Sequence, residues 1–382
     1  MRLIHCSDLH LDAPLITRHS DAAAAARRGE LLHTLQRLFD WAAQHKTDGL
    51  LLCGDLFDTS HPSARTIRAV EDLIRIHRNL EIFYLRGNHD MGDLLFADSP
   101  DPESFHRFDD RWTTYRLSFP QGGTRSGQDS VCRDICIHGA EIPGGLRTPP
   151  ITDPGDINIA LLHGQIQETL RPAGPDRIPL PLLRGRNIDY LALWHIHSCR
   201  ILKLDARGTA AYSGCLEGHG FDECGPCGFI LLDIDVQTGQ IRHRFIPFAS
   251  RQLFRIPCDI TGCSSVVSTS ERMDETLRAA QERRDCPVRE RDMVRVELTG
   301  APSYDCSADL RYLTESFADR FYYFTITDET HPAFHIEDFL SDPTLKGEFV
   351  RTVSGAPGIT AQDKEDILRC GLRALAGERV FL

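Results

Sequence analysis

Residues 81–90 read EIFYLRGNHD, in which an apolar run is followed by a glycine, an amide and an imidazole. The run EIFYL has the length and the aromatic and β-branched content of a short buried strand. A turn after this strand would need only Gly87 and Asn88. The adjacent His89 therefore indicates that the end of this strand carries chemistry.

The N-terminal half of the chain alternates such runs with segments of helical periodicity. The runs at 2–6 and 49–53 are predicted strands, and each is followed by a helix with apolar residues at spacings of three and four. Further predicted strands follow with little helix between them, at 134–139, 157–164, 189–197, 209–214 and 228–235. This order predicts an α/β layered core that passes into a more β-rich second half.

The character of the sequence changes near residues 247–255. The next 75 or so residues read strand, helix (about 271–285), strand, helix and strand, which predicts a compact α+β domain. From His331 the pattern is mostly helical. The predicted parts are residues 1–250, 256–330 and 331–382.

The composition is that of a globular protein without a secretion or membrane signal. The chain has 382 residues, of which 41% are hydrophobic, enough for one large and one smaller core. Asp8 interrupts the N-terminus before an apolar signal segment forms, and no later apolar run approaches the roughly 20 residues of a membrane span. Thirteen scattered cysteines suit reduced thiols better than a disulfide framework, so we expect a cytoplasmic protein.

Two local features of the composition allow alternative readings. The CGPC at 224–227, with Cys215 upstream, is half of a zinc site, a redox pair or a set of plain thiols; we favour plain thiols because no second pair lies at ligand spacing. The net charge of −12 argues against a wholly nucleic-acid-binding surface but not against a local basic track. That track contains Arg171, Arg177, Arg184, Arg186, Arg200 and Lys203. It is either a phosphate-facing patch or, as we favour from the charges alone, a solvated loop.

Polar side chains follow the predicted strands at the positions where the strands end. They are Asp8 and His10 after the first strand, Asp55 after the second, Asn88 and His89 after the third, and His163, His195 and His197 at later strand ends. Ligands bind at the carboxyl edge of α/β sheets, so residues remote in sequence converge there. Carboxylates, an amide oxygen and imidazoles together suit Mn²⁺, Fe²⁺ or Zn²⁺ better than Mg²⁺ or Ca²⁺.

Without His89, this set is too large for one ion and fits two ions that share a carboxylate. Paired divalent ions about 3.5–4 Å apart are a recurring device for cleaving phosphate esters, because they activate a water for attack on phosphorus. Asn88 would then bind metal, and His89 would protonate or stabilise the leaving oxygen. Each residue alone is more simply a turn, cap or loop residue, but their joint occurrence favours a metal centre.

These segments, in this order, resemble the motifs of the calcineurin-like metallophosphoesterase superfamily, which are DxH, GD, GNH[DE], H and GHxH. A finer resemblance is to the SbcD and YhaO type of DNA repair exonucleases. It is carried by LIHCSDLHLDAPL (3–15), GDLFDTSHPS (54–63) and AYSGCLEGHGFDECGPCGF (211–229). The resemblance covers about residues 1–245.

The resemblance implies a four-layer β-sandwich flanked by helices, followed by a small α+β capping domain and a helical C-terminal tail. It implies that one ion is held by Asp8, His10, Asp55 and His197, and the other by Asp55, Asn88, His163 and His195. Asp55 would bridge the ions, and His89 would be the catalytic histidine. Members of the family that this chain resembles act on DNA ends with Mn²⁺, and they pair with a coiled-coil ATPase of the SMC type through their C-terminal region. The resemblance implies the same substrate, metal and partner for this chain.

One position departs from the family pattern. Where the family has glycine before the two final histidines, this chain has Trp194. A glycine there allows close backbone approach beside the metals. The indole either packs against a neighbouring loop, which we favour, or stacks on a nucleotide base.

The sequence therefore predicts a Mn²⁺-dependent DNA exonuclease, to which we add endonuclease action as a second mode. Fe²⁺ and Zn²⁺ are alternative metals, and a homodimer is an additional expectation; no membrane association is expected. One alternative is a phosphoesterase of the same fold that acts on a small phosphoester. The other is a catalytically silent subunit that binds a partner.

Overall fold

The computed structural model describes residues 1–13, 21–58, 62–87, 89–90, 92, 94–117, 132–142, 146, 149–150, 152–170, 176–303, 306, 309–331 and 339–375. The chain divides into two compact units, Met1–Leu253 and Phe254–Leu382. The predicted further division of the second unit at residue 330 stays a prediction.

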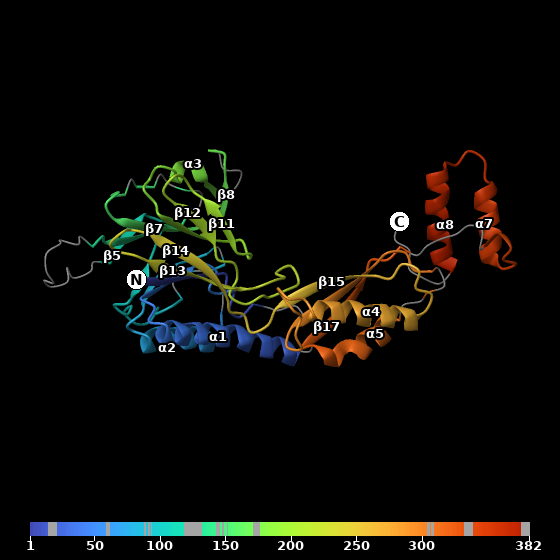
Figure 1. Ribbon diagram of the computed structural model, residues 1–382, viewed down its shortest axis with the longest axis horizontal. Helices are drawn as coiled ribbons and strands as arrows, with labels where there is room; N and C mark the ends of the chain where they lie inside the picture. The colour runs from blue at the N-terminus through green and yellow to red at the C-terminus, as the bar shows by residue number, and fades with distance from the viewer. Residues whose placement is uncertain are drawn as a thin grey trace. The chain divides into compact units, whose positions relative to one another are not determined.

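The first sheet of unit 1 has the strand order β14-β13-β1-β2-β3-β4; Figure 1 labels its antiparallel strands β13 and β14. Its strands are β1 (Arg2–Ser7), β2 (Gly49–Cys53), β3 (Glu81–Leu85), β4 (Phe105–Arg107), β13 (Gly228–Ile234) and β14 (Ile241–Pro247). Strands β1 to β4 run parallel, whereas β13 and β14 add an antiparallel edge. The parallel strands consequently present their carboxyl ends at one edge.

The second sheet of unit 1 has the strand order β11-β12-β10-β7-β6-β5. Its strands are β5 (Thr113–Leu117), β6 (Ile135–Gly139), β7 (Ile157–His163), β10 (Tyr190–Trp194), β11 (Arg200–Lys203) and β12 (Thr209–Tyr212). The four central strands are parallel and the two edge strands antiparallel. A separate pair joins β8 (Gln165–Gln167) to β9 (Arg177–Pro179). Exposed side chains break the apolar pattern of edge strands such as β11, so the sequence does not predict them.

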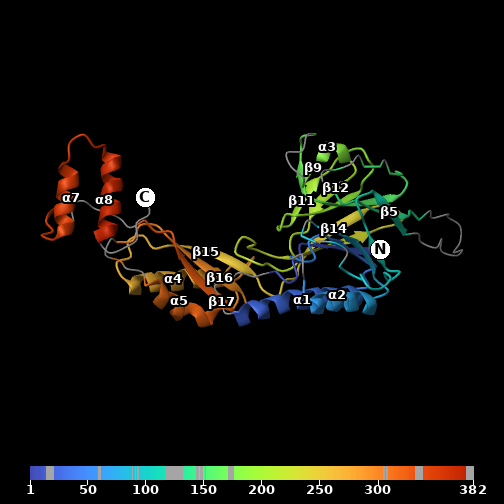
Figure 2. The same cartoon turned by 180° about the vertical axis from the view of Figure 1, so that it is seen from behind.

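The two sheets pack face to face and helices cover their outer faces. Along each strand alternate residues point to opposite faces, so Leu51 joins the core between the sheets while Leu50 joins the core under the helices. Helices α1 (Asp21–Gln44) and α2 (Ala64–Ile76) lie side by side on the first sheet (Figures 1 and 2), and the short α3 (Leu180–Leu183) packs on the second.

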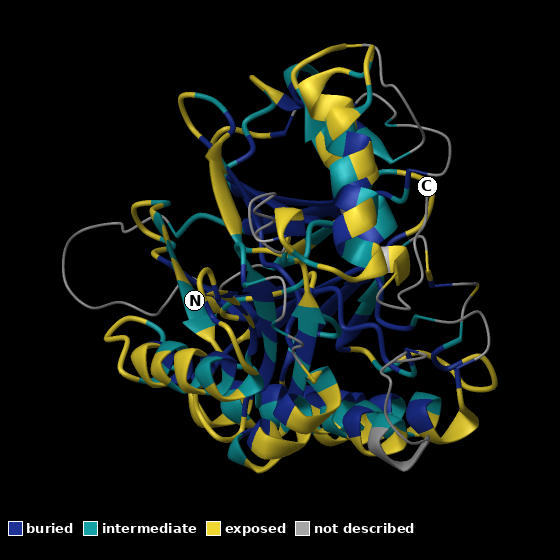
Figure 3. Ribbon diagram, turned by 90° about the vertical axis from the view of Figure 1, so that its right-hand side faces the viewer, coloured by how far each residue is buried: buried dark blue, intermediate teal, exposed yellow. Residues whose placement is uncertain are grey.

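Burial follows this layering (Figure 3): the central strands are buried on both faces, and the helices carry exposed residues on their outer sides. Burial on both faces explains the nearly continuous apolar runs of these strands. The predicted four-layer α/β architecture of the metallophosphoesterase type is confirmed.

Unit 2 begins with a small sheet of order β15-β16-β17, with β15 (Leu253–Asp259), β16 (Met293–Thr299) and β17 (Tyr323–Asp328). Helices α4 (Val266–Gln281) and α5 (Leu310–Phe317), followed by the turn Ala318–Arg320, share a core with it. The helix predicted at 271–285 begins earlier, at Val266, because Ser265 and Ser268 form a capping box at its start, and it ends earlier, at Gln281.

The remainder of unit 2 is a helical hairpin of α7 (Leu345–Gly355) and α8 (Ala361–Leu375), which has a separate small core around Val350 and Leu368 (Figure 2). Among the described residues, no helix combines the length and apolar content that a membrane span requires.

Trp194 and Gly54 constrain each other inside the core of unit 1. Trp194 is fully buried between the sheets. Gly54 has a φ of +64°, and a Cβ atom there would lie 1.5 Å from Nε1 of Trp194. Only glycine therefore fits at position 54 while the indole is in place.

We expect Gly54→Ala to lower the free energy of unfolding by about 2–5 kcal/mol, from left-handed backbone strain plus overpacking. The matched control is Gly185→Ala, because Gly185 also has a positive φ of +70° but open space around its Cβ position. That variant should lose only about 1–2 kcal/mol. Urea unfolding of both variants measures the difference, and equal losses would show that the Trp194 contact is unimportant.

Candidate metal centre

The carboxyl ends of strands from both sheets meet around one cavity. Asp8 directly follows β1, and His195 directly follows β10, while His163 is the last residue of β7. The cavity measures about 260 Å³ and is lined by His10, Ala13, Asp55, Asp58, His89, His195, His197, His219 and Glu223. The structure thus brings side chains from five predicted strand ends into one site.

Each predicted site residue can be placed except one. His10, Asp55, His89, His195 and His197 line the cavity, as expected for one site. Asp8 lies behind this wall next to His197, with 3.9 Å between Asp8 Oδ1 and His197 Nε2. His163 lies behind it next to His195, with their ring centroids 5.3 Å apart. Asn88 lies outside the described residues, so its role stays a prediction.

The backbone at the site adopts conformations that are unfavourable for residues with a Cβ atom. Asp8, His10, Asp55 and His195 have φ values of 50°, 44°, 45° and 98°. Non-glycine residues with positive φ cost of order 1–3 kcal/mol each and cluster at functional sites. The value at His195 also ends the strand predicted at 189–197 early, at Trp194.

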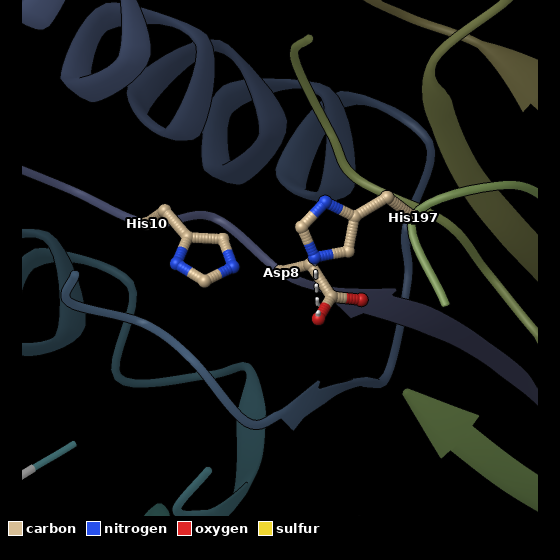
Figure 4. Close-up of side chains that lie close together, drawn as sticks. All are labelled: Asp8, His10 and His197. Carbon is tan, nitrogen blue, oxygen red and sulfur yellow. Dashed lines mark ion pairs between the residues drawn. The ribbon is translucent and has the colours of Figure 1, made fainter. Parts of the chain in front are cut away.

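Asp8, His10 and His197 form one of two groups of potential ligands among the described residues (Figure 4); the other is His10, Asp58 and His89. In the first group, one ligand atom from each residue lies within 4.8 Å of the others. The carboxylate of Asp8 is fully buried and is held in place by the Ser7 hydroxyl, which donates to Oδ2 at 2.7 Å, and by the backbone N–H of His195, which donates to Oδ1 at 3.3 Å. This geometry suits a shared divalent cation.

Asp55 lies where the second and third motifs meet. The backbone N–H of His89 donates to Asp55 Oδ1 at 3.0 Å. A Cβ atom on Gly87 would lie 2.1 Å from the same oxygen, so the glycine of the GNH segment leaves room for this carboxylate. The buried carboxylate of Asp90 fixes both loops by accepting N–H groups from Phe57 at 2.9 Å and from Gly87 at 3.0 Å.

Two of the predicted site histidines keep ring nitrogens for which the described residues offer no hydrogen-bond partner. These are Nε2 of His10 and both ring nitrogens of His163, and all three atoms are buried. Burial lowers the pKa of His163 to about 3 and that of His10 to about 4, so both rings are neutral. A neutral imidazole with a free nitrogen is the form that binds metal. Buried unpaired polar atoms beside buried carboxylates fit divalent cations well.

Three further residues of the cavity wall were not predicted from the sequence. Asp58 Oδ1 lies 2.7 Å from His10 Nδ1 and 3.4 Å from His89 Nδ1, so it orients both rings. Its place three residues after Asp55 is a local signal that could have identified it. His219 and Glu223 lie in the segment 211–229 that carries the finer resemblance, but the resemblance assigned neither of them a role.

Trp194 does not contact solvent and therefore does not stack on a substrate base. Its ring meets that of His163 edge-on, with centroids 5.4 Å apart. The predicted packing role agrees with this burial, and the indole packs against a histidine that is a predicted metal ligand. In the CGPC segment, the sulfurs of Cys215 and Cys227 lie 3.3 Å apart, and no group of three potential metal ligands among the described residues includes them.

The family model for calcineurin-like phosphoesterases matches residues 1–199 of the chain. The chain belongs to this family. The family expected from the motifs is thus confirmed. Metallophosphoesterases of this family use a pair of divalent metal ions.

Curated relatives and a solved structure are similar to large parts of the chain. This chain is 26% identical, over 73% of its length, to the DNA double-strand break repair protein Mre11 of Methanopyrus kandleri. It is 24% identical, over 72% of its length, to the uncharacterized metallophosphoesterase YhaO of Bacillus subtilis. The alignments cover 62% and 67% of those two relatives, so the chain spans about two thirds of their length. Among solved structures, TT1561 of Thermus thermophilus aligns with 64% of this chain and 98% of its own, at 10% identity and a TM-score of 0.38.

We expect His163→Ala to weaken the binding of one of two divalent ions by about 10–100-fold or more, because removal of a ligand exceeds the effect of removing its support. The control is His138→Ala, since His138 is also buried in the second sheet but lies 2.8 Å from the Thr114 hydroxyl and 3.0 Å from Asn158 Oδ1, within hydrogen-bonding distance of both. Metal analysis after equilibrium dialysis against Mn²⁺ measures the stoichiometry. If the His163→Ala variant still binds two ions, His163 is not a metal ligand.

Protons should compete with metal for two of the predicted ligands. Burial raises the pKa of Asp55 to about 8, and the hydrogen bond to Glu223 raises the pKa of His197 to about 9. Below these values both groups hold a proton that a cation must displace, so metal affinity should rise between about pH 7 and 9. Calorimetry of Mn²⁺ binding in two buffers with different ionisation enthalpies measures the released protons. An affinity that falls with rising pH in this range would contradict the assignment.

Proposed function

We propose that the chain is a Mn²⁺-dependent DNA exonuclease, with endonuclease action as a second mode. The observation that carries the proposal is one cavity lined by His10, Asp55 and His197, with the buried carboxylate of Asp8 and the unpaired ring of His163 directly behind its wall. Two relatives named as DNA double-strand break repair proteins, from Methanopyrus kandleri and Archaeoglobus fulgidus, support DNA as the substrate.

In this proposal the ligands divide between two ions. Asp8, His10, Asp55 and His197 hold the first; Asp55, Asn88, His163 and His195 hold the second. When bound, a pair of divalent ions polarises the phosphoryl group and activates a water for attack on phosphorus. The buried carboxylates and neutral imidazoles of the chain suit Mn²⁺, with Fe²⁺ and Zn²⁺ as alternatives.

His89 is the proposed proton donor to the leaving oxygen. Its side chain is 45% exposed and lies on the cavity wall, where an entering phosphodiester can reach it. Its backbone N–H is fixed on Asp55, and its ring lies edge-on to that of His10, with centroids 5.2 Å apart. A donor held beside the ligands but open to solvent is suited to protonating a departing alkoxide.

Part of the predicted basic track is available to phosphates. Arg200 and Lys203 lie on the fully exposed edge strand β11, which begins three residues after His197. Arg184, by contrast, is paired with Glu168 at 2.9 Å. Cations beside the site support contacts to a DNA backbone, while the net charge of −12 favours the rival substrate, a small phosphoester.

The proposal extends to partners and location. We propose that a coiled-coil ATPase of the SMC type binds through the C-terminal region, where Leu345 on α7 and Ile367 on α8 are exposed. A homodimer and a cytoplasmic location, in which thirteen thiols stay reduced, complete the proposal. Co-expression with an ATPase encoded beside this gene, followed by size-exclusion chromatography, tests the partnership.

We expect His89→Ala to slow Mn²⁺-dependent DNA degradation about 10²–10⁴-fold, because the leaving oxygen loses its acid, while metal remains bound. His243→Ala on β14 is the control, since that half-exposed histidine lies outside the cavity. The assay compares linear duplex and single-stranded DNA with a small phosphodiester. Equal DNA cleavage by variant and wild type would refute the role of His89.

The same assay separates the rival functions. Rapid turnover of the small phosphodiester with intact DNA would point to a small-molecule phosphoesterase. A wild-type protein that binds metal and cleaves neither substrate would point to the silent, partner-binding subunit.

A further inference from the structure

Glu223 places one carboxylate between two histidines of the cavity wall. Its Oε1 atom accepts a hydrogen bond from Nδ1 of His197, and its Oε2 atom lies 2.9 Å from Nδ1 of His219. Oε2 also accepts the backbone N–H of His219 at 2.6 Å. The Glu223 side chain is only 6% exposed, so these contacts, rather than water, set its orientation.

The contact with Glu223 decides which nitrogen His197 presents to the site. A carboxylate only accepts hydrogen bonds, so in the neutral ring Nδ1 carries the hydrogen and Nε2 keeps its lone pair. Nε2 lies 3.9 Å from Asp8 Oδ1, while Nδ1 is on the far side of the ring (Figure 4). Glu223 therefore directs the metal-binding nitrogen toward Asp8.

His219 extends the same support to a second loop. Its Nε2 atom lies 3.1 Å from the backbone carbonyl of Leu9, the residue between Asp8 and His10. Its ring also meets that of His10 edge-on, with centroids 5.4 Å apart. One carboxylate thus links the segment after β10 to the loop after β1.

Glu217, in the same loop as Glu223, contacts a different part of unit 1. Its carboxylate is also buried, and it bonds Arg27 at 3.0 Å, the Thr34 hydroxyl at 2.9 Å and the backbone N–H of Ser250 at 2.6 Å. None of these partners is a proposed metal ligand. Glu217 therefore offers a matched control, because its loss affects the loop and α1 without touching His197.

We propose that Glu223 is a positioning residue of the metal centre, which holds His197 with Nε2 toward Asp8 and, through His219, fixes the loop that carries Asp8 and His10. This inference rests on the proposed function only in taking these residues as ligands of a divalent cation. Removal of a group that orients a metal-binding histidine typically weakens metal affinity about 10–100-fold.

The test is Mn²⁺ binding to metal-free, full-length protein, measured by calorimetry and by electron paramagnetic resonance of free Mn²⁺. Measured above about pH 9, where His197 no longer holds the proton that Glu223 stabilises, Glu223→Ala should weaken binding about 10–100-fold. Glu223→Gln has the same size and should weaken it less, because its amide oxygen still accepts one of the two histidine hydrogen bonds. Glu217→Gln should bind Mn²⁺ as the wild type does but unfold at a lower temperature.

The outcomes distinguish this inference from the proposed function. A wild-type protein that binds no divalent cation overturns both. Wild-type affinity in both Glu223 variants overturns the positioning role alone, and so does an equal weakening in Glu223→Gln and Glu217→Gln, which would indicate a general effect of the loop. If Glu223→Ala does not fold, the comparison of the two glutamine variants decides the question.

Discussion

The register of the parallel strands is the constraint on which the site depends. Ser7 pairs with Cys53 and Cys53 with Leu85, so β1, β2 and β3 end at one level; in the facing sheet, Trp194 pairs with His163. A slip of one residue would turn every side chain of a strand to the opposite face. The buried cores on both faces forbid such a slip, and they therefore hold the loops that carry the predicted ligands at one edge.

The same packing lowers the stability of the folded chain at the site. Asp8 and Asp55 are buried carboxylates, and burial raises the pKa of each. Their loops also adopt left-handed backbone conformations at residues that have a Cβ atom. Bound cations would offset the burial of charge, whereas the backbone strain is balanced by the hydrogen bonds that Asp90 and Ser7 provide.

The sequence predicted the layered fold and the strand ends because both follow from local patterns. Apolar runs mark doubly buried strands, and short polar motifs such as GNHD mark the loops after them. Glu223 and His219 lie in the quoted segment 211–229, but no role could be assigned to them from the sequence, because their partners His197 and Leu9 lie 26 and 210 residues away. The start of α4 was missed because serine side chains, rather than apolar spacing, determine it.

The fit between Trp194 and Gly54 has an evolutionary consequence. An indole fills the volume that a side chain at position 54 would need, so the identities of the two positions are tied. Exchange of the tryptophan for glycine would leave a void beside His163 and remove the steric reason for glycine at position 54. Mutations at these sites should therefore be epistatic, because replacement of Trp194 removes the overpacking cost of a Cβ atom at position 54, whereas the cost of its left-handed φ remains.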